Sequence, residues 1–112
     1  MKLITAIIKP FKLEQVREAL MQADVQGMTV TEVRGQGRLV GQADIYRGAE
    51  NIPQLVAKLQ IDMVVEADDV ARIVDAILHA AQTGSVGDGK IFVSSIAHAV
   101  RIRTGELDEA AL

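Results

Sequence analysis

The stretch from Gly84 to Val93 carries the residues of this chain that are best suited to hold a phosphate. It reads GSVGDGKIFV, and Gly84, Gly89 and Lys90 have the spacing of a P-loop. Ile91 follows the lysine, where a P-loop has a serine or threonine hydroxyl for Mg²⁺. The predicted order of helix, loop and strand is also the reverse of a P-loop. The stretch therefore predicts either a different phosphate loop or an ordinary turn.

Glycines and cations could bind an anion together here. Gly87 and Gly89 permit left-handed backbone angles, so successive N–H groups can converge on an anion. Lys90 adds a positive charge, and Arg101 and Arg103 add planar guanidinium groups suited to phosphate oxygens. A glycine-rich loop between a helix and a strand is more often a plain turn, so composition alone leaves both interpretations open.

The composition predicts one globular domain over residues 1–112. Of the 112 residues, 49% are hydrophobic and 24% charged, and the net charge is −3. An acidic chain whose only aromatic residues are Phe11, Tyr46 and Phe92 is not expected to bind nucleic acid. The sequence has no cysteine, which fits a reducing cytoplasm. The first apolar run, Leu3 to Ile8, is too short to insert in a membrane.

Hydrophobic periodicity predicts two β-α-β units separated by a long polar segment, which is the ferredoxin-like βαββαβ pattern of the α+β class. The predicted strands cover residues 3–8, 28–34 with one wet face, 59–65 and 91–102, and the predicted helices cover residues 12–23 and 70–81. Asp68 and Asp69 are expected to cap the second helix, and Gly84 to stop it. The last strand would place Arg101 and Arg103 on one face.

Residues that often bind metals do not form a metal site in this sequence. His79 and His98 are far apart in the chain and have no paired spacing. Glu66, Asp68 and Asp69 are better explained by helix capping than by an acidic metal cluster.

Several motifs resemble the PII family of nitrogen-regulatory signal proteins, as a divergent paralogue. The similarity covers nearly the whole chain, and the segment from Thr83 to Val93 is a signature of that family. The other matching segments are Ile7-Ile8-Lys9-Pro10-Phe11, Gly27-Met28-Thr29-Val30-Thr31-Glu32-Val33, Gly35-Gln36-Gly37-Arg38, Tyr46-Arg47-Gly48-Ala49-Glu50 and Arg101-Ile102-Arg103-Thr104-Gly105-Glu106.

The resemblance implies a homotrimer that binds ATP or ADP in clefts between subunits. Gly87, Asp88, Gly89 and Lys90 would wrap the phosphates, which Gly37 and Arg38 would also approach. Arg101 and Arg103 would reach in from the neighbouring subunit, and Thr29 and Val64 would lie near the adenine or ribose. The full set of implied nucleotide-binding residues is Thr29, Gly37, Arg38, Val64, Gly87, Asp88, Gly89, Lys90, Arg101 and Arg103.

The polar segment at about residues 36–54 matches the T-loop of the family, which docks onto partner proteins. Tyr46 and Arg47 would lie in the partner-binding part of this loop. The resemblance implies a cytoplasmic signalling protein without enzymatic activity. Its partner would be a membrane transporter or a metabolic enzyme, which the sequence does not identify.

Three positions depart from the family pattern. Leu39 stands where members that sense 2-oxoglutarate have a glutamine that ligates Mg²⁺, whereas Lys58, a potential anion or effector contact, is present. Asn51 replaces a tyrosine that many members have uridylylated, and Ala49 replaces a serine that some have phosphorylated. We therefore expect 2-oxoglutarate sensing to be impaired. The sequence leaves open the role of Mg²⁺, the preference among ATP, ADP and AMP, and two alternatives: a sensor of another anion such as bicarbonate, or a weak ATPase.

Overall fold

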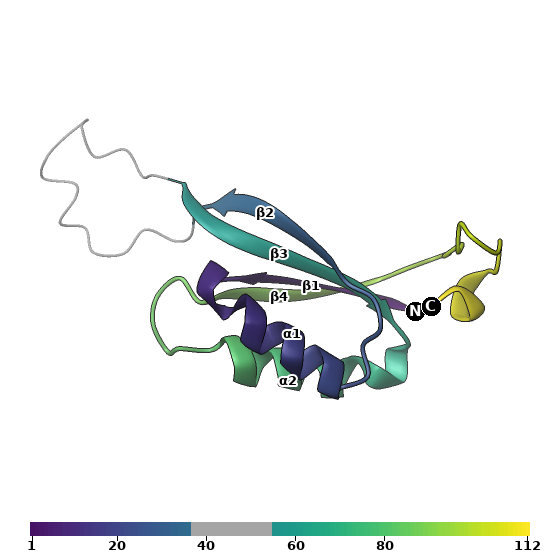
Figure 1. The fold of residues 1–112 in the computed structure, drawn as a ribbon, viewed down its shortest axis with the longest axis horizontal. Coiled ribbons are helices and arrows are strands. Elements are labelled where there is room, and N and C mark those ends of the chain that lie inside the picture. The colour runs from purple at the N-terminus through teal and green to yellow at the C-terminus, as the bar shows by residue number, and fades with distance from the viewer. Residues whose placement is uncertain (37–54) are drawn as a thin grey trace, which may run out of the picture.

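The computed structural model describes residues 1–36 and 55–112 as a four-stranded antiparallel sheet covered on one face by two helices (Figure 1). The strand order is β2-β3-β1-β4, and the chain order is the predicted βαββαβ, so the ferredoxin-like fold is confirmed. The elements are β1 (Lys2–Ile8), α1 (Leu13–Gln22), β2 (Thr29–Gly35), β3 (Val56–Val65), α2 (Val70–Ala81) and β4 (Gly89–Ser95).

The core lies between the sheet and the two helices. Alternate residues of β1 and β3 point to the helices, among them Ile4 and Ile61, which are completely buried. From the helices, Leu20 and Ile77 are also completely buried, at the helical spacing that the sequence predicts. Every second residue of the strands and one face of each helix therefore contribute side chains to the same apolar layer.

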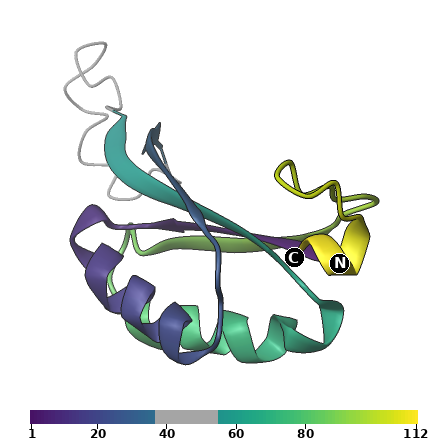
Figure 2. The same cartoon turned by 45° about the vertical axis from the view of Figure 1, so that its right-hand side comes forward.

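Within residues 1–36 and 55–112, no second layer of helices or strands covers the other face of the sheet (Figure 2). We call it the open face; the register places on it Leu3, Thr5, Ile7, Lys58, Gln60, Asp62, Val64, Lys90 and Phe92. Phe92 is 54% exposed there. Thr5 Oγ1 donates to Asp62 Oδ1 at 2.6 Å, and Gln60 Nε2 donates to Asp62 Oδ2 at 2.9 Å, so part of the face is a polar network.

The edge strand β2 differs from its prediction as a strand with one wet face. Val30 is paired with the buried Ile61 and lies on the helix-facing side, yet it is 40% exposed. β2 is the edge strand beside β3, and its far end rises away from the two helices (Figure 2). Both faces of β2 therefore meet solvent in the single chain.

The predicted bounds of α2, residues 70–81, are confirmed, but the signals expected to start and stop the helix are not. Asp69 stands at the N-cap position, but no carboxylate makes a capping hydrogen bond there: residues 67–69 form a short 3₁₀ turn, and the Asp69 carboxylate pairs with Arg72 at 3.2 Å instead. Gly84 does not stop the helix either, because Gln82 already has an extended backbone. Gly84, with φ of +86°, belongs to the following loop.

The last predicted strand is too long. β4 ends at Ser95, and the chain leaves the sheet and folds back on itself, with Val100 bridged to Leu107. Arg101 and Arg103 therefore lie in a turn rather than on one face of a strand. Within the described residues, no helix is long and apolar enough to cross a membrane.

Candidate functional site

The glycine-rich loop connects α2 to β4 and lies at the end of β1. Gly89 starts β4 and pairs with Ile8, the last residue of β1. Its φ is +107°, and a Cβ at this position would lie 1.7 Å from the carbonyl oxygen of Ile7. Gly87 has φ of +92°, and a Cβ there would lie 3.3 Å from Lys58 Nζ. Both glycines have the positive φ that the sequence was expected to permit; at Gly89 the backbone of β1 also leaves no room for a side chain, whereas at Gly87 the near atom belongs to the Lys58 side chain.

Asp88 turns its carboxylate into the loop. The backbone N–H groups of Thr83 and Gly84 each donate to Asp88 Oδ2 at 2.8 Å, and the Thr83 hydroxyl donates to Oδ1. The hydroxyl and N–H of Thr83 are the main causes that hold the pKa of Asp88 far below its usual value. Burial opposes this shift by less than Thr83 causes, and Gly84 and Lys9 lower the pKa a little further. By accepting these hydrogen bonds, the Asp88 carboxylate fixes the conformation of the loop.

Lys9 is a part of the site that the sequence did not single out as functional. Its ammonium group contacts three residues of the loop: Asp88 Oδ1 at 3.1 Å, Ser85 Oγ at 2.8 Å and Thr83 Oγ1 at 3.2 Å. The sequence signal that could have identified Lys9 is its position between the last residue of β1 and Pro10. The proline ring fixes the direction of the backbone at this point. Lys9 therefore ties the end of β1 to the loop.

Two more lysines border a hollow of about 250 Å³ on the open face, beside the loop. Lys58 donates a hydrogen bond to the Gly87 carbonyl, and Lys90 follows Gly89 on β4. Ile7 and Phe92 also line this hollow. We call these residues the loop cluster: Ile7, Lys58, Gly87, Gly89, Lys90 and Phe92.

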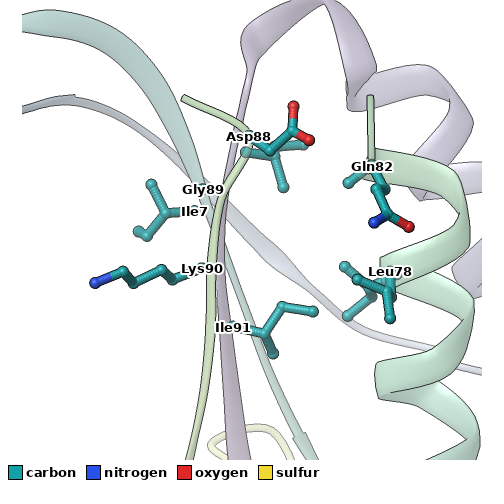
Figure 3. Close-up of a pocket in the computed structure, with 10 residues that line it drawn as sticks. Ile7, Leu78, Gln82, Asp88, Gly89, Lys90 and Ile91 are labelled. Atoms are coloured by element: carbon teal, nitrogen blue, oxygen red, sulfur yellow. The ribbon is translucent and has the colours of Figure 1, made fainter. Parts of the chain in front are cut away.

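The opposite side of β4 borders a different hollow. Figure 3 shows Lys90 pointing away from Ile91, from Leu78 of α2 and from Gln82, which follows that helix. This second hollow has about 360 Å³ and is lined mainly by apolar side chains. Because strand side chains alternate, the lysine lies on the open face and the isoleucine faces the helix layer.

Thr29 and Val64 lie toward the other end of the sheet. Thr29 pairs with Asp62, and Val64 is two residues further along the same face of β3. Lys58 of the loop cluster precedes Val64 by six positions on β3, which corresponds to about 20 Å of strand. One chain therefore does not bring Thr29 and Val64 to the loop.

The C-terminal segment lies at the end of the sheet opposite the glycine-rich loop (Figure 1). Arg101 Nη2 donates to the carbonyl oxygen of Leu112 at 2.9 Å, and Leu112 lines a hollow of about 230 Å³ together with Val64. Arg103 is exposed in the turn that follows Arg101. We call the four residues at this end, Thr29, Val64, Arg101 and Arg103, the arginine cluster.

Other predicted residues lie outside the described part of the chain. Gly37, Arg38, Leu39, Tyr46 and Arg47 belong to residues 37–54, so their proposed roles stay predictions. Within residues 1–36 and 55–112, no group of three or more histidine or acidic side chains could hold a metal ion.

Comparisons with known proteins give the same family over the whole chain. The family model for nitrogen regulatory protein P-II matches residues 1–106. Nitrogen regulatory protein GlnK of Escherichia coli K12 is 54% identical, and nitrogen regulatory protein P-II of Rhizobium etli 57% identical, each over 112 residues and the full length of both chains. The crystal structure of Arabidopsis thaliana PII bound to citrate has a TM-score of 0.81 and 35% identity, covering 99% of this chain and 91% of that one. The chain belongs to the P-II family of nitrogen regulatory proteins.

Proposed function

We propose that this P-II protein binds ATP or ADP in clefts between the subunits of a homotrimer and regulates a partner transporter or enzyme through its T-loop. The observation that carries the proposal is the separation of the loop cluster from the arginine cluster. Both clusters have phosphate-binding chemistry, yet they lie at opposite ends of one sheet. A single nucleotide can contact both only where the ends of two chains meet.

The open face supports assembly. It presents Leu3, Ile7, Val64 and Phe92, and the helices of the same chain do not cover it. Burying such apolar area stabilises an assembly by about 25 cal/mol per Å². Sheet-to-sheet packing of several copies would cover this face and bring the loop cluster of one copy near the arginine cluster of the next.

The chemistry of the loop cluster supports an anionic ligand. Lys58 and Lys90 supply positive charge beside backbone that only glycine can form at Gly89. The relative from Arabidopsis thaliana was crystallised with citrate, which is itself a polyanion. Cations near a preformed loop favour phosphates through charge-assisted hydrogen bonds worth roughly 1.5–3 kcal/mol each.

Calorimetric titration with ATP, ADP and AMP, each with Mg²⁺, tests nucleotide binding directly. We expect binding of ATP or ADP. We expect no enhancement of that binding by 2-oxoglutarate, because the side chain of Leu39 has no oxygen atom to ligate Mg²⁺. The absence of any nucleotide binding would refute the proposed ligand. Tight 2-oxoglutarate binding with Mg-ATP would refute only the role given to Leu39.

Mixed oligomers test whether the site is shared between chains. One variant, Lys90→Gln, damages the loop cluster, and a second, Arg101→Gln with Arg103→Gln, damages the arginine cluster. Each variant alone should bind ATP weakly, whereas co-expressed mixtures should regain a fraction of sites with wild-type affinity. If both clusters served one site within a chain, mixing would restore nothing, because every chain would carry a damaged site.

Deletion of T-loop residues tests the regulatory half of the proposal. A protein without residues 40–52 should still bind nucleotide. Its partner, however, should no longer co-purify with it from cell extract in the presence of ATP or ADP. A partner that binds the shortened protein as well as the intact one would contradict the assignment of the T-loop.

A further inference from the structure

Two hydrogen bonds fix the backbone of Arg101. Its N–H donates to the carbonyl of Glu106 at 2.9 Å, and its carbonyl accepts from Gly105 N–H at 2.7 Å. Gly105 has φ of +74°, the left-handed conformation that allows this tight turn. The Cα of Arg101 is therefore fixed at the base of a short closed turn.

The guanidinium group of Arg101 is fixed as well. Nη1 donates to Glu106 Oε1 at 3.1 Å, and Nη2 donates to the Leu112 carbonyl at 2.9 Å. Thr104 Oγ1 donates to the same Glu106 oxygen at 2.7 Å and accepts from Glu106 N–H at 3.3 Å. Thr104 thus braces the carboxylate that holds the arginine.

Arg103, two residues later, is different. Within the described residues its side chain makes no hydrogen bond or ion pair, and it is exposed at the turn. The arginine cluster therefore contains one guanidinium group in a defined position and one that is free to adjust.

We propose that Glu106 is a positioning residue that pre-orders Arg101 for the phosphates of the nucleotide, an inference that rests on the function proposed above. A guanidinium group has five N–H donors, so the two contacts leave other donors for a ligand. Binding then has to restrict fewer side-chain rotamers, which improves affinity. The repulsion between Glu106 and a phosphate is weakened by solvent, because the Glu106 side chain is 46% exposed.

Calorimetric titration of the full-length protein with ATP tests this role. We expect Glu106→Gln to weaken ATP binding about two- to tenfold, the effect of ordering one long side chain. Thr104→Val removes the brace without changing any charge and should weaken binding in the same direction by a smaller factor. Glu18→Gln removes an exposed carboxylate from α1 and should leave the affinity unchanged, which controls for net charge.

A double-substitution cycle separates positioning from a general structural effect. In an Arg101→Gln background, Glu106→Gln should have no further effect on ATP affinity, because the group that it positions is gone. The inference is overturned if Glu106→Gln tightens binding or leaves it unchanged, or if it weakens binding equally in both backgrounds. Failure of the wild-type protein to bind any nucleotide would instead overturn the proposed function, and this inference with it.

Discussion

At the scale of single residues, Asp88 shows how an acidic side chain can belong to the loop that we propose as an anion site. Asp88 was expected beside the phosphates, but its carboxylate accepts from the Thr83 and Gly84 N–H groups and pairs with Lys9. A carboxylate in this position fixes the loop geometry and keeps the Lys9 ammonium in place. Asp88 therefore supports the loop structurally, and under the proposed function the lysines and glycines would contact the ligand.

Asp88→Asn should lower the free energy of unfolding at pH 7, because the ion pair with Lys9 and the charge-assisted bonds from Thr83 are lost. The pKa of Asp88 is lowered in the folded state, so its stabilisation is fully present above the unfolded-state pKa of about 3.9. It is lost as the pH falls from there toward the folded-state pKa. Urea unfolding at several pH values should show the two proteins converging below about pH 4.

The control for this measurement is Asp68→Asn, which changes an exposed carboxylate in the turn before α2. Its free energy of unfolding should stay within about 0.5 kcal/mol of the wild-type value. A difference between Asp88→Asn and the wild type that stays constant down to pH 3 would contradict the role given to the Asp88 carboxylate.

Gly89→Ala should destabilise the fold by at least about 3 kcal/mol, since the new methyl group combines a positive φ with a clash against the Ile7 carbonyl. Gly84→Ala has a positive φ but open space, and should lose about 1–2 kcal/mol. Gly27→Ala has neither problem and serves as the neutral control. Urea unfolding measures all three, and equal losses at Gly89 and Gly84 would show that the clash is relieved.

At the scale of elements, α2 positions the loop by burying one face against β1 and the neighbouring helix α1. Its buried residues are Ile73, Ile77 and Ala81, and the loop begins directly after the last of them. The carboxylates before this helix do not cap it, so packing, rather than capping, determines where the helix lies.

Ile77→Ala should lower the free energy of unfolding by about 2–5 kcal/mol, because it leaves a cavity at a completely buried site. Leu78→Ala alters the next residue of the same helix, which is 47% exposed, and should cost less than about 1 kcal/mol. Chemical denaturation with an unchanged m-value checks both. Similar losses at the two positions would mean that the outer side of α2 is covered in solution.

At the scale of the whole molecule, the proposed function requires more than one chain. The open face carries apolar side chains that no layer of the described residues covers, and the two clusters lie at different ends of the sheet. Assembly would bury the open face and bring the two clusters of different chains together. A substitution that prevents assembly should therefore also abolish ligand binding.

Phe92→Asp should give monomers or unstable assemblies, because it places a charge at an exposed position of the open face. Phe11→Asp changes a residue that is 69% exposed before α1 and should leave the assembly intact. Light scattering after size-exclusion chromatography gives the masses, with the wild type expected at three times the chain mass. A Phe92→Asp protein of wild-type mass would exclude this face from the interface.

The sequence by itself determined the order of elements, the core periodicity and the glycines of the loop. These features depend on neighbours along the chain: Leu20 and Ile77 lie on their apolar stripes, and Gly89 needs the backbone freedom of glycine. Only the tertiary structure decided where charged groups go. Two contacts show this: the ion pair of Asp88 with Lys9, and the hydrogen bond of Arg101 to Glu106. Each depends on how the chain folds back on itself in space. Local patterns carry no information about such meetings, because an exposed lysine and one that closes a loop look alike in sequence.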